Sequence, residues 1–452
     1  MAVSIGAASG QELWELTPYR VKVLVAFDST PEFTDRLQED LRAELLGRVD
    51  VLLGGVWRTE IGTPAPVLAL AMLRDLEAVD PERMLPESAE FDKIFLMTVR
   101  RDRDGPELAV REFDVRTRLF SAVVVRREWQ IGKLRDLAAD ALWEAFAPLA
   151  QIEHVENKQA VLRAKAAALS PGDQRLALVK PGQVFRPVVR YNDRHGNPRR
   201  ITPVPWTFCH VEEVGDEGVV TRVISGMRSP LSGRRRGRVE PLALAVVPPR
   251  RPSALHLQSR FEPKQPLAGF QVYAHPADSK TTVLVGSTDR SGRIDVAPTD
   301  SPLRVLIVQS GSQPLARLPI VPGLEPVLTA EVMDDRQRLE AEGFVRGIQE
   351  ELLDLVARRH VLLAQIRRAT EAGQFDRAGT LIEQLQRLPS SSAFARGMAA
   401  QRSSLRSSDP VVQAKIDAMF DQTQAMIVEH LDPETVQDVW RQWRAARNAA
   451  GS

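Results

Sequence analysis

The residues whose types and spacing could do chemistry are concentrated in one arginine-rich segment, SGMRSPLSGRRRGR. Its five arginines are Arg228, Arg234, Arg235, Arg236 and Arg238. Clustered guanidinium groups bind nucleic acid, anionic polysaccharide or lipid head groups, so this segment is our candidate anion-binding site. No aromatic residue that could stack on bases lies between the first and last of these arginines, and a solvated loop is the alternative interpretation.

The arginine cluster is local, because the chain as a whole is close to neutral. Lys and Arg number 60 and Asp and Glu number 59, which gives a formal net charge of +1 over 452 residues. From Arg186 to Pro252, in contrast, 13 arginines stand against six acidic residues. The near-neutral total argues against a polybasic protein that coats nucleic acid or a membrane. An anionic polymer is therefore a candidate partner of the cluster, and nucleic acid is the least favoured one.

Metal and nucleophile chemistry is poorly represented in the sequence. The seven histidines show no HxxxH or HExxH spacing, and a single cysteine, Cys209, cannot form a disulfide framework, a CxxC pair or a thiolate zinc cluster. Cys209 and His210 are neighbours in a predicted strand, where adjacent side chains point to opposite faces and do not form a nucleophile–base pair. The P-loop and GxSxG patterns are also missing. We therefore expect no metal, no cofactor and no identifiable catalytic residue.

An enzyme whose site lies on the N-terminal part of the chain is the alternative. Asp28 directly follows the first predicted strand, where a carboxylate either faces a ligand or caps the next helix. Gly54 and Gly55 could approach a phosphate, but no Lys, Ser or Thr directly follows them, which favours close packing at a strand kink. We rank this enzyme hypothesis below a binding protein.

Two tryptophans near the C-terminus form a second candidate site. Trp440 and Trp443 lie three residues apart in a predicted helix, so their rings share one face of it. They could dock a partner or a membrane surface. Packing on their own domain is the commoner outcome for paired tryptophans and is the alternative.

These candidate residues must be positioned by a chain that is long enough for about three domains. Hydrophobic residues make up 43% and charged residues 26%, as in folded soluble domains. Residues 18–169 alternate strand and helix patterns in the order βαβαβββα, which predicts an α/β layer domain with a mixed sheet. We expect a first strand at Arg20–Phe27, a helix that begins at Ser29 or Thr30, and a second strand at Asp50–Trp57.

Two β-rich units are expected next. Residues 177–249 carry short alternating segments separated by Pro and Gly, which predicts a small β-barrel-like domain. Residues 255–329 contain the hairpin GSTDRSGR, from Gly286 to Arg293, followed by the apolar strand Leu303–Val308. This segment resembles the prealbumin-like, carboxypeptidase-regulatory-type β-sandwich, whose hallmark is a G-x-T-D-x-x-G-x hairpin before a V-x-V strand. The resemblance implies a structural or adhesive module without catalytic residues.

Residues 331–452 keep a helical period of apolar residues and predict a C-terminal helical bundle. Within them, residues 364–388 resemble the helix-turn-helix unit of tetratricopeptide-like repeats. The resemblance implies a turn at Gly373, with Phe375 and Ala378 packed inside. Only one such unit is visible and about three are needed for a stable solenoid, so a helical hairpin or bundle is the expected form.

Residues 1–17 are expected to be disordered or to be the remnant of an export segment. Ala2–Gln11 is small and uncharged, like the end of a secretory signal peptide, although the basic and long apolar regions of such a signal are missing. The most apolar stretch, Pro66–Leu73, is too short to span a bilayer, so we expect no transmembrane segment. The element order of the N-terminal domain also resembles that of bacterial envelope lipoproteins of the curli-secretion type. We therefore expect a periplasmic or extracytoplasmic protein, with a cytoplasmic one as the alternative.

Together, these observations predict a multi-domain α+β protein that acts as a non-enzymatic interaction or scaffold protein of the cell envelope. It would bind an unidentified protein or envelope component, with the Arg228–Arg238 loop as the best candidate contact. The alternative is a hydrolase or nucleotide-dependent enzyme on the N-terminal domain. The third hypothesis is anion or nucleic-acid binding through the arginine loop alone.

Overall fold

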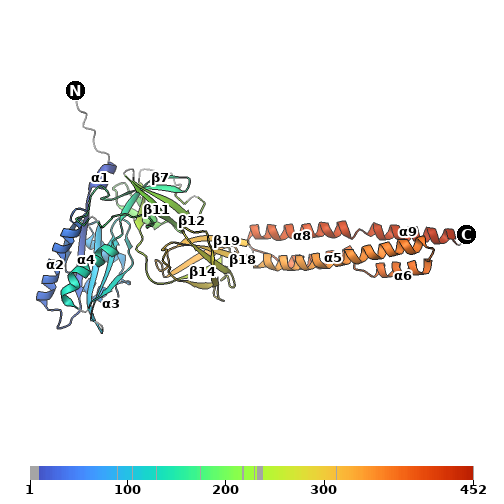
Figure 1. Cartoon of the computed structure of the whole chain (residues 1–452), viewed down its shortest axis with the longest axis horizontal. Helices are drawn as coiled ribbons and strands as arrows, with labels where there is room; N and C mark the ends of the chain where they lie inside the picture. The colour runs from blue at the N-terminus through green and yellow to red at the C-terminus, as the bar shows by residue number, and fades with distance from the viewer. Residues whose placement is uncertain are drawn as a thin grey trace, which may run out of the picture.

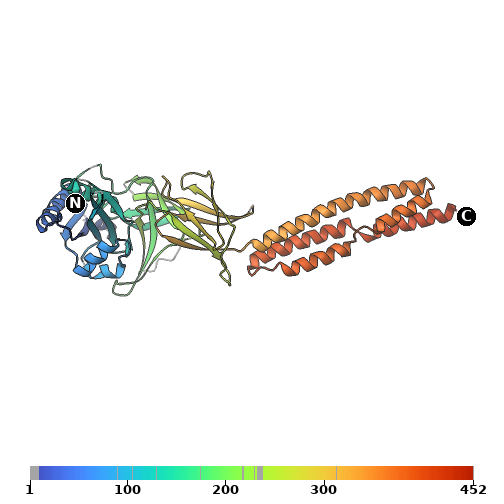
Figure 2. The ribbon, with the colours of Figure 1, turned by 90° about the horizontal axis from the view of Figure 1, so that it is seen from below.

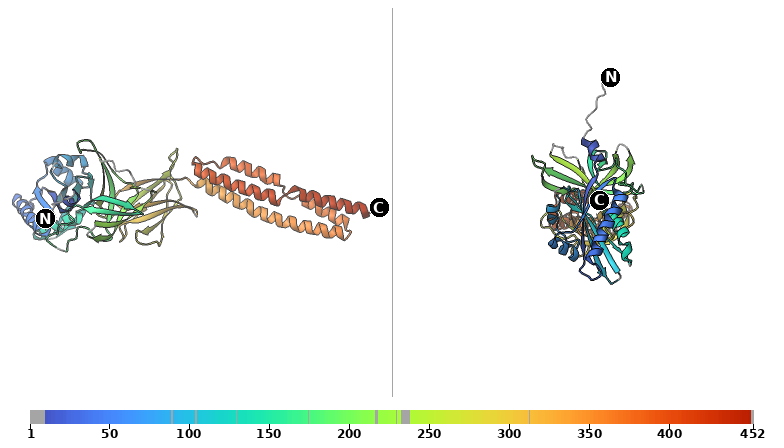
Figure 3. Two further views of the ribbon diagram at one scale, coloured as in Figure 1. Left: turned by 90° about the horizontal axis from the view of Figure 1, so that it is seen from above. Right: turned by 90° about the vertical axis from the view of Figure 1, so that its left-hand side faces the viewer.

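The computed structural model describes residues 10–450 except residues 89, 104, 129, 174, 216–217, 229, 232–237 and 312. It has a head of three β-containing units and a long helical arm that projects from the third unit (Figures 1 and 2). The arm continues the long axis of the head, so the end-on view in Figure 3 places the C-terminus behind the head.

The first unit is a mixed β-sheet with helices on both faces. β1 runs parallel to β2 and β3, and β4 is antiparallel to β3. α2 and α4 pack in the core on one face, whereas Leu68 and Met72 of α3 are buried against Leu24 and Leu96 on the other. The elements are α1 (Gly10–Leu16), β1 (Tyr19–Phe27), α2 (Asp35–Leu53), β2 (Trp57–Gly62), α3 (Pro66–Arg74), the 3₁₀ helix Pro81–Glu87, β3 (Lys93–Asp102), β4 (Gly105–Asp114), β5 (Leu119–Phe120), β6 (Val124–Arg127), the 3₁₀ helix Ile131–Lys133 and α4 (Leu134–Ala145).

Two boundaries expected in this unit are wrong. Asp50–Trp57 is not a strand, because its first part continues α2 and β2 begins only at Trp57. The buried residues of α2 are spaced four apart and therefore lie on one helix face: Leu41, Leu45, Val49 and Leu53. α2 also begins later than Ser29 or Thr30: the hydroxyl of Thr34 accepts the Leu37 N–H at 3.3 Å and caps the helix.

The second unit is a closed β-barrel. Six strands pair in the order β9-β11-β12-β8-β7-β13, and the pairing of β13 with β9 closes the ring, while β10 pairs with β9 outside it. The strands are β7 (Leu149–Glu156), β8 (Gln159–Ala164), β9 (Val184–Asn192), β10 (Pro198–Pro203), β11 (Thr207–Gly215), β12 (Gly218–Ser225) and β13 (Val239–Ala245). β7 and β8 fall inside the range 18–169 expected for the α/β domain. The boundary expected near residue 169 therefore lies after the first two strands of the barrel.

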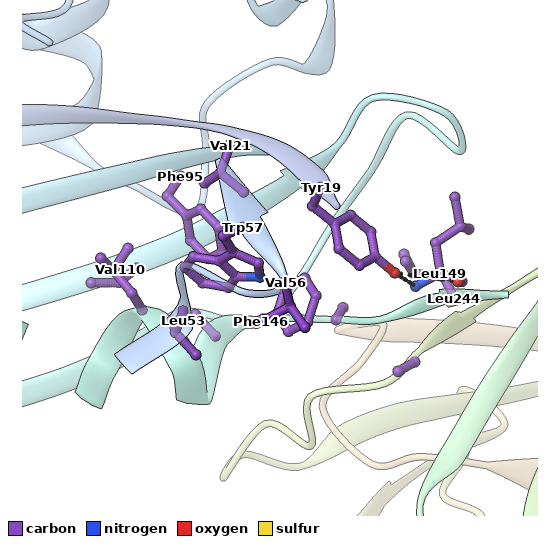
Figure 4. Close-up of a cluster of buried hydrophobic side chains, with 14 of the residues drawn as sticks. Tyr19, Val21, Leu53, Val56, Trp57, Phe95, Val110, Phe146, Leu149 and Leu244 are labelled. Atoms are coloured by element: carbon purple, nitrogen blue, oxygen red, sulfur yellow. Dashed lines mark hydrogen bonds between the residues drawn. The ribbon is translucent and has the colours of Figure 1, made fainter. Parts of the chain in front are cut away.

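The α/β unit and the barrel share one apolar core (Figure 4). Tyr19 at the start of β1 is fully buried, and its hydroxyl lies 3.0 Å from the backbone N and 3.3 Å from the carbonyl oxygen of Leu149 in β7. Trp57 packs beside it, with its ring 5.3 Å from that of Phe95 and 5.0 Å from that of Phe146. The two units are therefore held together by packing and hydrogen bonds, and not by the connecting chain alone.

The third unit is a β-sandwich of a three-stranded and a four-stranded sheet that enclose a common core. In the expected hairpin, the Asp289 carboxylate accepts the N–H groups of Ser291 and Arg293, each at 2.9 Å. Gly292 has a φ of +72°, which favours glycine, so the predicted turn is confirmed. The strands are β14 (Ser253–Ser259), β15 (Gln271–Pro276), β16 (Val283–Ser287), β17 (Arg293–Val296), β18 (Arg304–Ser310), β19 (Gln313–Ile320) and β20 (Val327–Val332).

The arm is a helical bundle built on one long helix. Its helices are α5 (Arg336–Glu371), α6 (Phe375–Gln386), α7 (Ser391–Ser404), α8 (Pro410–His430) and α9 (Pro433–Ala450). α5 has 36 residues and is therefore about 54 Å long. Its first half packs with α7 and α8 in a core next to the head, and its second half packs with α6 and α9 in a separate core at the tip. Gly373 has a φ of +70° at the turn, and Ala378 is fully buried.

The predicted fold class is confirmed: the chain is a multi-domain α+β protein with an α/β unit, a small barrel, a sandwich and a C-terminal helical bundle. Across the part of the chain that the structure describes, no helix combines the length and apolar character needed to cross a bilayer.

Candidate functional site

The arginine-rich segment leaves the barrel after β12 and returns to it at β13. Arg228 follows β12 and Arg238 precedes β13, and both side chains are exposed. The Arg238 carbonyl accepts the Asn192 N–H at 2.8 Å, which holds the returning end of the segment against β9. The other three predicted residues, Arg234, Arg235 and Arg236, lie outside the described residues. The structure therefore places the two ends of the predicted site.

A cavity of about 590 Å³ lies at the start of this segment, between the barrel and the sandwich. We call it the seam pocket. Four cationic side chains line it: Lys158 between β7 and β8, Arg222 on β12, Arg228 after β12, and Arg317 on β19. The sequence analysis selected Arg228 and missed the other three. They are distant in sequence, and only the strand order of the barrel and its contact with β19 bring them together.

Close backbone contacts hold the walls of the seam pocket in place. Asn157 and Lys158 have positive φ values of 47° and 68°, and the Lys158 carbonyl accepts the Val223 N–H at 2.7 Å. Gly226 lies so near the sandwich that a Cβ added there would be 2.2 Å from the carbonyl oxygen of Arg317. This approach, which only glycine allows, presses the chain two residues before Arg228 against the backbone of Arg317.

Cations outnumber anions in the seam pocket. The carboxylates of Glu156 and Glu212 also line it, so four cations and two carboxylates leave a formal charge of +2. Glu212 lies 3.2 Å from Arg222, and Glu156 lies 3.3 Å from His154. Lys158, Arg228 and Arg317 have no ion-pair partner among the described residues. Unpaired cations that share one cavity repel each other, and an anion between them relieves this repulsion.

The structure places the two predicted tryptophans in the core at the tip of the arm. Trp440 and Trp443 are half-buried, with ring centroids 6.4 Å apart, and they pack against α5 and α6. The indole N–H of Trp443 donates to the Phe375 carbonyl at 3.1 Å. The guanidinium of Arg444 lies 3.6 Å from the centre of the Trp440 ring. Both tryptophans thus pack in the core of the tip without being fully buried.

Cys209 is buried. It is fully enclosed in the barrel core, and burial raises the pKa of its thiol to about 12, so it is not a thiolate at neutral pH. His210 lies half-buried on the same strand, and burial lowers the pKa of its imidazole. Within the described ranges, no three His, Cys, Asp or Glu side chains are arranged to hold a metal ion.

The residues of the alternative enzyme hypothesis lie just after β1 and at the end of α2. The Asp28 N–H donates to the Val99 carbonyl at 2.9 Å, which ties the end of β1 to β3 at the place where a ligand of such a sheet would bind. Asp28 does not cap α2, because Thr34 does. Gly54 caps the end of α2, and a Cβ on Gly55 would lie 2.0 Å from the Ser170 carbonyl oxygen. The glycine pair is therefore required for close packing.

The sequence analysis missed a buried group of charges at the junction of the α/β unit and the barrel. Lys93 is fully buried, and its ammonium lies 2.7 Å from Glu112 and 2.9 Å from Asp114. Burial raises the pKa of Glu112 to about 7, against the opposing effect of Lys93. Burial also lowers the pKa of Lys93, but Asp114 and Glu112 together outweigh it, and the pKa of Lys93 is raised. Strand alternation alone could not reveal this group, because Lys93 lies at the edge of an apolar run.

Comparisons with known proteins identify no family. No family model and no curated protein matches the chain. Among solved structures, the hypothetical protein CT253 from Chlamydia trachomatis is 14% identical, with 24% of this chain and 71% of that chain covered and a TM-score of 0.18. Lipoprotein GNA1162 from Neisseria meningitidis is 16% identical, with 28% and 96% covered and a TM-score of 0.17.

A third structure, TolB from Acinetobacter baumannii, is 9% identical, with 70% of this chain and 96% of that chain covered and a TM-score of 0.20. These scores are too low to support an argument about function. The resemblances to prealbumin-like sandwiches, tetratricopeptide-like repeats and curli-secretion-type lipoproteins are not confirmed by these comparisons.

Proposed function

We propose that this chain is a non-enzymatic scaffold protein of the cell envelope that holds a protein partner along its helical arm. One observation carries the proposal: the arm projects from the head (Figure 1), and large apolar side chains are exposed along it. Leu353, Val361 and Val428 are 68%, 56% and 60% exposed. Single exposed apolar residues are normal on a protein surface, but a series of them on a projecting element is typical of an interaction surface.

The base of the arm is fixed to the head, so the arm presents its surface in a defined direction. Asp335 and Arg338, which are 1% and 4% exposed, form a buried ion pair of 2.7 Å within the first turn of α5, which orders that turn. A Cβ on Gly311 in the sandwich would lie 2.7 Å from Leu339, which shows how closely the helix packs there. Lys415 of α8 donates to the Gln313 side chain at 3.1 Å.

The chemistry of the arm surface favours a protein partner. Glu350 and Arg346, three and seven residues before Leu353 on α5, are exposed on the same helix face, so both signs of charge lie beside the apolar residue. A protein interface typically has such an apolar centre with a polar rim, whereas a membrane or nucleic-acid surface calls for an excess of cations. Trp440 and Trp443, which are half-buried at the tip, remain our proposed second contact.

The proposal that the scaffold lies in the cell envelope is based on the sequence. The small, uncharged stretch at Ala2–Gln11 supports export, although residues 1–9 lie outside the described residues. The GSTDRSGR hairpin supports a prealbumin-like adhesive module in the head, with its turn formed by Asp289 and Gly292.

Site-specific photo-crosslinking in living cells tests the proposal. A photoreactive amino acid is placed at Leu353, Val361 or Val428, and in a control at Val51 of α2, which is also 68% exposed but lies on the head. We expect the same partner protein to crosslink from the arm positions and not from Val51. The Leu353→Asp substitution should then abolish the crosslink at Val361. No crosslinked protein at any arm position, or equal crosslinking from Val51, would contradict the proposal.

A further inference from the structure

We propose that the seam pocket binds a small ligand that carries a phosphate monoester. This inference goes beyond the scaffold role, because the pocket lies in the head, between the barrel and the sandwich, and the arm contributes no residue to it. It also differs from anion binding by the arginine-rich loop, because three of its four cations belong to the walls of the barrel and the sandwich.

The charge of the pocket matches this ligand. The lining has a formal charge of +2, and a phosphate monoester carries about −1.5 to −2 at neutral pH. Lys158, Arg228 and Arg317 have no ion-pair partner within the described parts of the chain, so their hydrogen-bond donors are free for phosphate oxygens. Guanidinium groups bind phosphate through two parallel hydrogen bonds, which a lysine cannot do.

The remaining surface of the pocket suits the organic part of the ligand. Apolar side chains line it on the barrel side, including Val155, Val223 and Ile224, and Ala277 does so on the sandwich side. A volume of about 590 Å³ is within the usual range for small-molecule sites and is larger than a phosphate ion requires. The pocket is therefore suited to an ester with an apolar group, in preference to free inorganic phosphate.

The walls are positioned before any ligand enters. Gly226 contacts the Arg317 backbone, and the Lys158 carbonyl is bonded to Val223 of β12. The hydroxyl of Ser225 lies 2.8 Å from that of Thr207 and accepts the Met227 N–H at 2.9 Å, which orders the chain that leads to Arg228. Because the site is already formed, binding costs less conformational entropy, and a small ligand with few contacts can still bind.

Calorimetric titration of the full-length protein with phenyl phosphate tests the proposal, with phenol and inorganic phosphate as reference ligands. We expect phenyl phosphate to bind, phenol not to bind, and inorganic phosphate to bind more weakly. Arg317→Ala and Arg228→Ala should each weaken phenyl phosphate binding on the order of tenfold. The matched control is Arg290→Ala, since Arg290 is an exposed arginine of the sandwich that does not line the pocket. It should leave the affinity unchanged.

A second experiment distinguishes a lipid phosphate from a soluble phosphate ester. Cosedimentation with phosphatidic acid vesicles that is lost in Arg317→Ala would support the proposal and identify a lipid head group as the bound phosphate. Binding of phenyl phosphate without cosedimentation would support it with a soluble ester. Two results would overturn it: no binding of either phosphate source, or binding that survives Arg317→Ala and Arg228→Ala but is lost in Arg234/Arg235/Arg236→Ala, which would assign the anion site to the loop.

Discussion

The ammonium of Lys93 and the carboxylate of Glu112 lie 2.7 Å apart in a space closed to solvent. The same ammonium donates to the Ala147 carbonyl at 2.5 Å, and the second Glu112 oxygen accepts the Ala147 N–H at 2.8 Å. Ala147 stands two residues before β7. One buried ion pair of the α/β sheet thus holds both backbone groups of a residue on the path into the barrel, and couples the two units.

Replacing Lys93 with methionine should strongly destabilise the head. At pH 8, above the pKa of about 7 of Glu112, the substitution leaves the carboxylates of Glu112 and Asp114 buried without their cation, and breaking a buried ion pair in this way costs about 3–5 kcal/mol. Urea unfolding followed by tryptophan fluorescence measures the loss. The control is Lys22→Met, because Lys22 pairs with Glu87 at 2.6 Å but both side chains are about a quarter exposed. This variant should lose about 1 kcal/mol or less. Equal losses in the two variants would contradict the buried-pair argument.

The contribution of Glu112 to the stability of the head should fall as pH rises between about 4.5 and 7. The pKa of Glu112 is raised from 4.5 in the unfolded chain to about 7 in the fold, so over this range the folded state binds more protons. The contribution of protonated Glu112 is complete below about pH 4.5 and is lost as pH passes about 7. Thermal unfolding from pH 4.5 to 8 measures the slope. In Glu112→Gln the decline should be smaller than in the natural protein, and identical slopes would count against this assignment.

Gly55→Ala should disturb the contact between the α/β unit and the segment after β8. The new Cβ would lie 2.0 Å from the Ser170 carbonyl oxygen, a backbone atom that cannot yield alone. We expect a loss of about 1–3 kcal/mol in the free energy of unfolding, as for other overpacked sites. Gly47→Ala is the matched control, because its Cβ would meet nothing within 4 Å on α2. It should stabilise the protein by about 0.5–1 kcal/mol. If Gly47→Ala destabilised the protein as much as Gly55→Ala, the loss at Gly55 could not be assigned to the contact with Ser170.

Trp443→Ala should loosen the tip of the arm and spare its base. Trp443 packs on α6 and donates to Phe375, whereas the base has a separate core. We expect hydrogen exchange, measured by mass spectrometry, to become about tenfold faster in α6 and α9. This corresponds to a loss of about 1.4 kcal/mol in the free energy of local opening. Exchange in α7 should be unchanged. Similar acceleration in α6 and α7 would indicate a single cooperative core along the arm.

The sequence predicted element types well where periodicity and turn residues agreed. The GSTDRSGR hairpin and the turn at Gly373 were expected because a residue with positive φ in a tight turn favours glycine, and both positions are such turns. The order of domain types was also evident, because strands and helices differ in their apolar spacing.

The sequence failed where contacts between distant residues decide the structure. Val51–Leu53 is an apolar run that suits a strand as well as a helix, and only burial on the α2 face distinguishes them. β7 and β8 belong to the barrel because they pair with β12 and β13, far along the chain. For the same reason, the seam pocket could not be predicted: Lys158 and Arg317 are separated by about half of the head in sequence and line one cavity only in the folded barrel and sandwich.

The two cores of the arm have a consequence for how the chain acquires its structure during synthesis. The tip core needs Val439, Trp440 and Trp443 of α9, which is made last among the described elements, although Leu363 and Ile366 of α5 emerge about 70 residues earlier. While the ribosome makes the chain between them, only α6 is present to cover that face of α5. The far half of α5 therefore remains incompletely sheltered until the final helix arrives, which makes this half of the arm the part on which a nascent-chain chaperone would act.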